Sequence, residues 1–187
     1  MASTLAPAAT SAATNLENEA EPPAFISGRF QLTLLRPKQN VPSLHLFGID
    51  GRTIDLATLR GKPILLNFWA TWCPACRTEL PMLDRLLQHE RGNGLRILAV
   101  SEDRADRQVV ERFVSEIGIK NVPVYLDPNG YAAYSNPENP RHAPFALYGM
   151  PVTYAIAASG WIVGYIAGAA DWTAPDGQRF ISFLYGA

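Results

Sequence analysis

The only two cysteines of this 187-residue chain, Cys73 and Cys76, lie three positions apart between an apolar segment and an amphipathic one. Residues 63–69 are largely apolar and predict a buried strand, whereas residues 77–91 carry leucines at helical spacing. Cys73 is therefore expected near a helix N-terminus, where unpaired N–H groups and the helix dipole favour a thiolate over a thiol. Residues i and i+3 of a helix lie roughly 5 Å apart, a separation that a disulfide tolerates. The spacing predicts a reversible dithiol.

The composition indicates a soluble globular domain behind a flexible tether. Hydrophobic residues make up 48% of the chain, charged residues 18%, and the net charge is −1, which argues against nucleic acid or an anionic membrane surface as the partner. Residues 1–24 are rich in Ala, Ser, Thr and Pro and predict the tether, and residues 25–187 predict one domain. No basic and apolar leader is recognisable. Two expectations stay open: a cytosolic protein, or one whose anchor has been removed.

Strand and helix patterns alternate along the domain before a hairpin closes it. Strands are expected over residues 44–49, 53–56, 63–69, 95–101, 123–126, 153–157 and 161–166, and helices over 77–91, 106–117 and 178–185. This order predicts an α/β fold, a mixed sheet with helices on both faces. Asp103 and Asp106 are interpreted as a solvated entry to the second helix. Residues 129–149 hold three prolines and predict an irregular loop, either functional or an incidental surface excursion.

Residues 67–81, Asn-Phe-Trp-Ala-Thr-Trp-Cys-Pro-Ala-Cys-Arg-Thr-Glu-Leu-Pro, resemble the active-site segment of the thioredoxin superfamily. More narrowly, they resemble the TlpA/ResA-like thiol–disulfide oxidoreductases of the bacterial cell envelope. The similarity extends to residues 50–51, 59–62 and 149–153 and covers about residues 40–187. It implies a thioredoxin fold with extra N-terminal strands and an insertion before a cis-proline strand. It also implies an N-terminal membrane anchor and a domain on the periplasmic side of a bacterial inner membrane.

The resemblance gives the two cysteines separate roles. Cys73, beside Trp72, is expected to be an exposed nucleophile that attacks a target disulfide, and Cys76 is expected to resolve the mixed disulfide. The alternative is a pair of inert thiols or a static bridge. Cys76 must lose a proton when it attacks, and Asn67, where many thioredoxins have an acid, cannot accept one. Glu79 lies on the same helical face, and the family's matching glutamate assists this transfer; the alternative is an ordinary exposed glutamate.

The second half of the implied site is the Met150-Pro151 dipeptide. The family has a cis proline here that faces the dithiol, and the backbone before it pairs with an extended substrate. A trans proline at a strand start is the alternative. Trp72, Pro74, Met150 and Pro151 are thus assigned to substrate binding. The residues between the cysteines are Pro-Ala, and because this pair tunes thiolate stability it leaves the direction of the redox reaction open.

The favoured function is therefore a thiol–disulfide reductase of envelope proteins, of the cytochrome c or copper-site maturation type. Alternatives are a dithiol oxidase that introduces disulfides, a Cu(I)-handling module that uses the two thiolates, and a cytoplasmic location. A peroxidase is disfavoured because both cysteines fall within one turn. His45, His89 and His142 lack ligand spacing, so no metal and no cofactor beyond the Cys73–Cys76 dithiol is expected. The expected partners of this monomeric domain are a disulfide-containing protein and a membrane electron donor of the disulfide-relay type.

Overall fold

The computed structural model describes residues 21–187, and its largest element is an eight-stranded β-sheet. In chain order the strands of this sheet are β3 (Thr33–Asn40), β4 (His45–Gly48), β5 (Thr53–Asp55), β6 (Ile64–Trp69), β7 (Arg96–Ser101), β8 (Val124–Leu126), β11 (Val152–Ile156) and β12 (Trp161–Ala167). Two short strand pairs lie outside it, β1 (Ile26–Ser27) with β2 (Phe30–Gln31), and β9 (Ala133–Tyr134) with β10 (Phe145–Ala146). The helices are the 3₁₀-helix η1 (Leu56–Leu59) and the α-helices α1 (Pro74–His89), α2 (Arg107–Glu116) and α3 (Pro175–Gly186). Most of the expected tether, residues 1–20, lies outside the described residues.

The sheet is mixed, as the order of predicted elements required. Its strands follow the order β3-β12-β11-β6-β7-β8-β4-β5. The central strands β6, β7 and β8 are parallel, and every other pair is antiparallel. Nearly every residue of β6 and β7 is buried, which explains why both segments are mostly apolar in the sequence, with Asn67 as the one polar residue inside β6. The carboxyl ends of β6, β7 and β8 therefore meet at one edge of the sheet.

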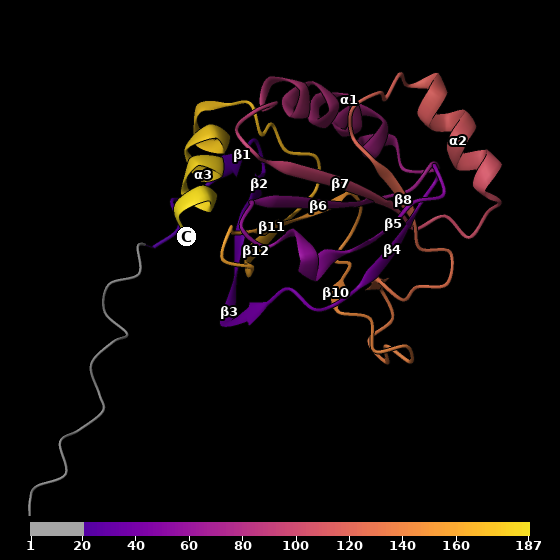
Figure 1. Ribbon diagram of the computed structural model, residues 1–187, viewed down its shortest axis with the longest axis horizontal. Helices are drawn as coiled ribbons and strands as arrows, with labels where there is room; N and C mark the ends of the chain where they lie inside the picture. Colours follow the sequence, from indigo (N-terminus) through magenta and orange to yellow (C-terminus); the bar gives the residue numbers. More distant parts are fainter. Residues whose placement is uncertain (1–20) are drawn as a thin grey trace, which may run out of the picture.

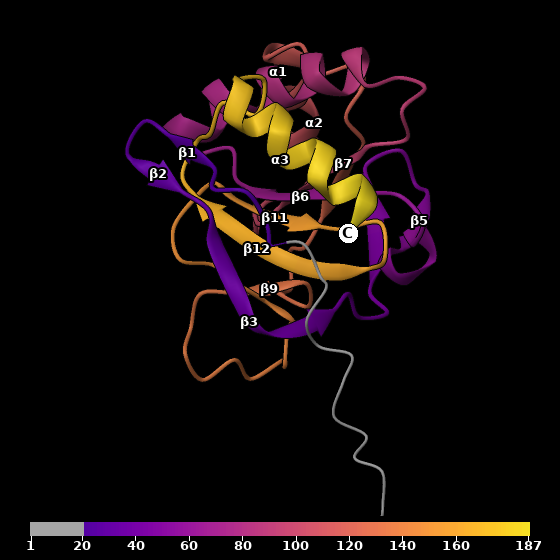
Figure 2. The same ribbon diagram turned by 90° about the vertical axis from the view of Figure 1, so that its left-hand side faces the viewer.

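The three α-helices all cover one face of the sheet, which we call the first face (Figures 1 and 2). Alternate residues of the strands enter two apolar clusters, one for each face. The first cluster takes the buried side chains of all three helices, among them Leu80 of α1, Phe113 of α2 and Phe180 of α3. Because Cys76 and Glu79 lie on the same face of α1 as Leu80, this packing also presses both of them toward the sheet.

The second face is covered by an irregular segment, and here the prediction of helices on both faces needs correction. In residues 21–187 the only helix that contributes to the second cluster is η1, through Leu56 and Leu59. The rest of the cover comes from the segment between β8 and β11, which buries Phe145 and includes the parallel pair β9 and β10. In Figure 1 this segment lies on the opposite side of the sheet from α1. Three prolines between residues 137 and 144 prevent a helix there.

The other predicted elements are present, with ends that differ by a few residues. The extra N-terminal strands implied by the resemblance are also found, although no pattern located β3 itself. This edge strand has no apolar alternation and contains a cis Arg36–Pro37 bond. It approaches β12 so closely that a Cβ on Gly164 would lie 2.3 Å from the Thr33 carbonyl oxygen. A residue without a side chain is therefore needed where the register of this strand pair shifts.

Candidate active site

The two cysteines form a disulfide at the start of α1. Their Cα atoms are 5.3 Å apart, within the separation predicted for positions i and i+3. Cys73 caps the helix, and its sulfur accepts a hydrogen bond from the Cys76 backbone N–H at 3.1 Å. Pro74 occupies the first turn, where its missing N–H costs no helical hydrogen bond. The Cys76 N–H group and the helix dipole would both stabilise a Cys73 thiolate after reduction.

Cys73 is less exposed than the sequence predicted. Its residue surface is only 4% accessible, and that of Cys76 is 0%. The expectation of an exposed nucleophile is therefore wrong for the oxidised protein, because the disulfide holds the Cys73 sulfur against the first helical turn. Cys73 nevertheless lines a cavity of about 940 Å³, together with Trp72, Pro74 and Met150. A partner can therefore reach this cysteine from the cavity, whereas Cys76 lies behind it.

Glu79 is fully buried beneath the dithiol, which excludes the alternative of an ordinary exposed glutamate. Its Oε2 accepts a hydrogen bond from Asn67 Nδ2 at 2.9 Å, and its Oε1 accepts one from the Ala170 N–H at 3.0 Å. Asn67 Nδ2 also donates to Thr153 Oγ1 at 2.9 Å. Burial raises the pKa of Glu79 to about 7, against the opposing effect of the Ala170 and Asn67 hydrogen bonds. A carboxyl with this pKa can hold or release a proton near neutral pH.

The Met150–Pro151 peptide bond is cis, as the resemblance implied. Met150 lines the cavity, and the buried Pro151 directly precedes β11. Trp72 is 69% exposed at the cavity margin, an unusual exposure for so large an apolar side chain. Of the residues predicted for this site, Trp72, Cys73, Pro74 and Met150 thus share one cavity, and Cys76, Glu79 and Pro151 lie behind its lining.

Sequence reasoning missed three acidic residues of the cavity. Glu102 and Asp103 directly follow β7 and Asp127 directly follows β8, and all three line the cavity. The signal was present, since side chains at the carboxyl ends of parallel strands meet at one edge of a sheet. Asp103, interpreted from sequence as solvated, is 4% exposed. It accepts hydrogen bonds from the Thr71 N–H at 2.9 Å and Thr71 Oγ1 at 2.7 Å, and so fixes the chain just before Cys73.

Glu102 differs from its acidic neighbours because its Oε1 is buried without a hydrogen-bond partner in the described residues. Burial, together with the negative charges of Asp127 and Asp103, raises the pKa of Glu102 to about 8, against the lowering effect of the Arg104 charge. The Glu102 carboxyl is therefore mostly protonated at neutral pH. Asp127, in contrast, accepts hydrogen bonds from the backbone N–H groups of three following residues, Tyr131, Ala132 and Ala133.

Residues 127–149 form the side of the cavity that does not carry the dithiol, and we call them the loop wall. Its lining side chains include Tyr134, Asn136, Asn139 and Arg141. In residues 21–187 no group of three or more His, Cys, Asp or Glu side chains is arranged to hold a metal ion. The Cu(I)-handling alternative would therefore depend on the two cysteine sulfurs without a third ligand from the described residues.

Comparison with known proteins gives consistent matches. Residues 37–163 match the model of the AhpC/TSA family. The thiol-disulfide oxidoreductase ResA of Oceanobacillus iheyensis is 36% identical over 121 residues, 65% of this chain and 57% of that protein. The ResA protein of Bacillus subtilis is 30% identical over 129 residues, 69% of this chain and 66% of that protein. The chain thus spans about 57–66% of the length of these two curated relatives.

Among solved structures, a thioredoxin-family thiol:disulfide interchange protein from Chlorobium tepidum superposes with a TM-score of 0.60 at 26% identity. The alignment covers 78% of this chain and 96% of that one. The mixed sheet with its helix after the cysteine pair is therefore a thioredoxin fold, as the resemblance implied.

Proposed function

The chain belongs to the AhpC/TSA family, and on that premise we propose that it is a thiol–disulfide oxidoreductase that reduces disulfides in protein substrates. One observation carries the proposal. Cys73 of the cysteine pair at the N-terminus of α1 borders a cavity, and the carboxyl of Glu79 lies buried one helical turn behind Cys76. A purely structural disulfide needs neither the cavity nor a buried acid whose pKa is near 7. The names of the curated relatives agree with this activity.

The proposed reaction transfers two electrons from the reduced cysteine pair to the target. The Cys73 thiolate attacks one sulfur of the target disulfide; a mixed disulfide forms and the other target sulfur leaves as a thiolate. Cys76 loses its proton and attacks the Cys73 sulfur, which releases the second target thiol and closes the Cys73–Cys76 disulfide. The target gains two electrons and two protons. A dithiol reductant from outside the chain must then reduce the protein again.

Glu79 is the proposed proton acceptor for Cys76. Both side chains are fully buried on one face of α1, three residues apart. Burial raises a thiol's pKa, so Cys76 would attack slowly without a base. Above pH 7 the Glu79 carboxylate is available, held in place by Asn67 and the Ala170 N–H. The proton can return to solvent or to the departing thiolate once the target leaves.

We further propose that the domain works outside the cytoplasm, on disulfides of apocytochromes or copper-site assembly factors, and receives its electrons from a membrane disulfide relay. The family resemblance supports this placement. No helix within residues 21–187 combines the length and the apolar character needed to cross a bilayer. Spheroplast fractionation with an antibody against the native protein would test the location, and purely cytoplasmic recovery would contradict it.

A single-turnover experiment tests the activity. Protein reduced in advance and freed of reductant is mixed with a disulfide-linked peptide, and free thiols and protein-bound peptide are measured by mass spectrometry. We expect one peptide disulfide to be reduced for each Cys73–Cys76 disulfide formed. The Cys76→Ser variant should accumulate the mixed disulfide, because its resolving thiol is missing. Reduction by a Cys73→Ser variant at the wild-type rate would overturn the proposal.

A further inference from the structure

We propose that the loop wall selects the protein substrate, and that Arg141 binds a carboxylate of an Asp or Glu side chain near the target disulfide. The occupant of the cavity is an extended segment of a protein with an acidic residue within a few positions of the reacting cysteine. This inference rests on the proposed disulfide reductase activity. The inference adds a residue that determines which protein disulfides react fastest with the dithiol.

The loop wall is built as a fixed surface although it contains little regular structure. At the beginning of the loop wall, the Asp127 carboxylate accepts hydrogen bonds from three backbone N–H groups. Asn139 exchanges two hydrogen bonds with the Ala143 backbone, both of 2.9 Å, and closes the turn that holds Arg141. Phe145 is fully buried between the rings of Phe68 and Tyr154. A side chain carried on such a surface loses little conformational freedom when it binds a ligand.

Arg141 is the cationic side chain of the loop wall that can bind an anionic ligand. Its guanidinium lies over the Tyr131 ring, 4.7 Å from the ring centroid. No carboxylate of residues 21–187 lies within ion-pair distance of it. A ring contact positions a guanidinium while leaving its N–H groups able to donate, and these match a carboxylate in pairs.

The acidic residues of the cavity form no ion pair with Arg141. Asp103 and Asp127 keep their negative charges, but their carboxylates accept hydrogen bonds from Thr71 and from the start of the loop wall. Glu102 has a pKa of about 8 and is largely protonated at pH 7. The groups that face Glu102 are Asp103, Asp127 and Arg104. An acidic substrate therefore meets Arg141 and Arg104 without repulsion from an ionised Glu102.

The aromatic margin of the cavity favours a polypeptide over a small anion. Trp72 lines the cavity and is 69% exposed. Tyr131, which is 58% exposed, does not line the cavity itself but contacts the lining residue Arg141 through its ring. Tryptophan, tyrosine and arginine are the residues that dominate protein–protein binding energy. A cavity of about 940 Å³ also reaches the upper end of what one drug-sized ligand fills, roughly 1,000 Å³. A short stretch of extended chain fits both observations.

Three disulfide-linked peptides test the inference. They differ only in the residue two positions from the cysteine, which is Glu, Gln or Lys, and each rate is divided by the rate with dithiothreitol to remove intrinsic reactivity. Pre-reduced protein should react with the Glu peptide about five- to tenfold faster than with the Gln peptide at pH 7, and slowest with the Lys peptide. Arg141→Ala should reduce this preference to less than twofold. Arg141→Glu should reverse it toward the Lys peptide.

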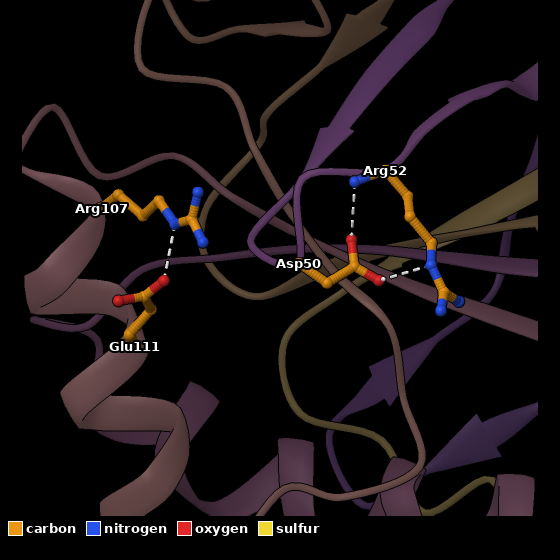
Figure 3. Close-up of polar contacts among 4 residues, drawn as sticks. All are labelled: Asp50, Arg52, Arg107 and Glu111. Atoms are coloured by element: carbon orange, nitrogen blue, oxygen red, sulfur yellow. Dashed lines mark hydrogen bonds and ion pairs between the residues drawn. The ribbon is translucent and has the colours of Figure 1, made fainter.

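A control variant separates specific binding from general charge. Arg107→Ala removes the same charge, but the Arg107 guanidinium is already paired with Glu111 at 2.6 Å on α2 (Figure 3), so the peptide preference should stay. At pH 9 the preference of the wild type should shrink because Glu102 ionises, and Glu102→Gln should preserve it.

The outcomes distinguish two failures. Equal rates with all three peptides, or an unchanged preference in Arg141→Ala, would overturn the role of Arg141 while the reductase activity stands. Bis(2-hydroxyethyl) disulfide is a small neutral substrate whose reduction reports the dithiol chemistry alone. The Arg141→Ala variant should reduce this disulfide at the wild-type rate. If the wild type reduced neither this compound nor any peptide, the proposed function itself would fail, and the inference with it.

Discussion

The two sides of the cavity are built in different ways. The dithiol side is made of regular elements: Cys73 caps α1, Pro151 directly precedes β11, and Glu79 of α1 accepts a hydrogen bond from β6. The loop wall on the other side, residues 127–149, contains only the two-residue strands β9 and β10 and depends on side-chain hydrogen bonds for its shape.

This difference separates the proposed chemistry from the proposed selectivity. The reacting atoms need fixed distances, and helix and strand ends supply them through main-chain geometry. A recognition surface can vary as long as it remains rigid, and polar anchors such as Asp127 provide rigidity without a helix. Substitutions on the dithiol side should therefore change the rate for every disulfide, and those in the loop wall should change which disulfide is preferred.

The largest expected effect is on the dithiol side. Cys73→Ser removes the attacking sulfur, so the rate should fall to that of buffer for peptides and for bis(2-hydroxyethyl) disulfide alike. Stopped-flow or quenched thiol quantification measures both rates. A variant that lost activity on peptides only would contradict the assignment of Cys73 to the chemistry.

Glu79→Gln should slow resolution of the mixed disulfide by about 10- to 100-fold above pH 7, because it removes the proposed base. In the wild type this step should accelerate as pH rises through about 7, where Glu79 ionises, and the inflection should be absent in the variant. Glu111→Gln, the same change on the exposed surface of α2 (Figure 3), serves as the control. Superimposable pH profiles for the wild type and Glu79→Gln would refute the role.

Asp127→Ala should loosen the loop wall. The carboxylate accepts from the N–H groups of Tyr131, Ala132 and Ala133, and their loss should lower the free energy of unfolding by about 2–3 kcal/mol. Urea titration measures this, and Asp127→Asn should lose less because one acceptor oxygen remains. The rate with bis(2-hydroxyethyl) disulfide should be retained while the peptide preference weakens. Loss of both rates together would show that the two sides are not separable.

The smallest effect concerns Glu102 and the pH dependence of stability. Because burial raises the pKa of Glu102 to about 8, the folded state holds this proton more tightly than the unfolded chain does. Its contribution to stability is thus fully present at acidic pH and is lost as pH rises through about 8. Between pH 5.5 and pH 9 the wild type should lose about 1–2 kcal/mol more than Glu102→Gln. If the free energies of unfolding from urea titrations of the two proteins changed in parallel with pH, the raised pKa of Glu102 would be contradicted.

The dithiol side could be predicted because its signals are local in sequence. The Cys73–Cys76 spacing, the helical pattern behind it and Met150-Pro151 each lie within a few residues, and the bond and the cis peptide are present as expected. The fixed position of Glu79 follows from the same helix, although its partner Ala170 lies 91 residues away.

The loop wall could not be predicted in the same way. Its prolines predicted irregular structure, but the place of Arg141 depends on the Asn139–Ala143 turn and on a distant aromatic contact, Phe145 with Phe68. No period in the sequence encodes such contacts. Asp103 was interpreted as solvated because its acceptor role for Thr71, 32 residues earlier, depends on the tertiary fold.

The reduction potential of the Cys73–Cys76 pair decides whether this dithiol can act as a reductant of protein disulfides. The protein is equilibrated in defined thiol–disulfide buffers, acid-quenched and alkylated, and the free thiols are counted by mass. We expect a reversible two-electron transition near the thioredoxin value of about −270 mV. A midpoint near −120 mV, typical of a strong oxidant, or a disulfide that never equilibrates with the buffer, would contradict it.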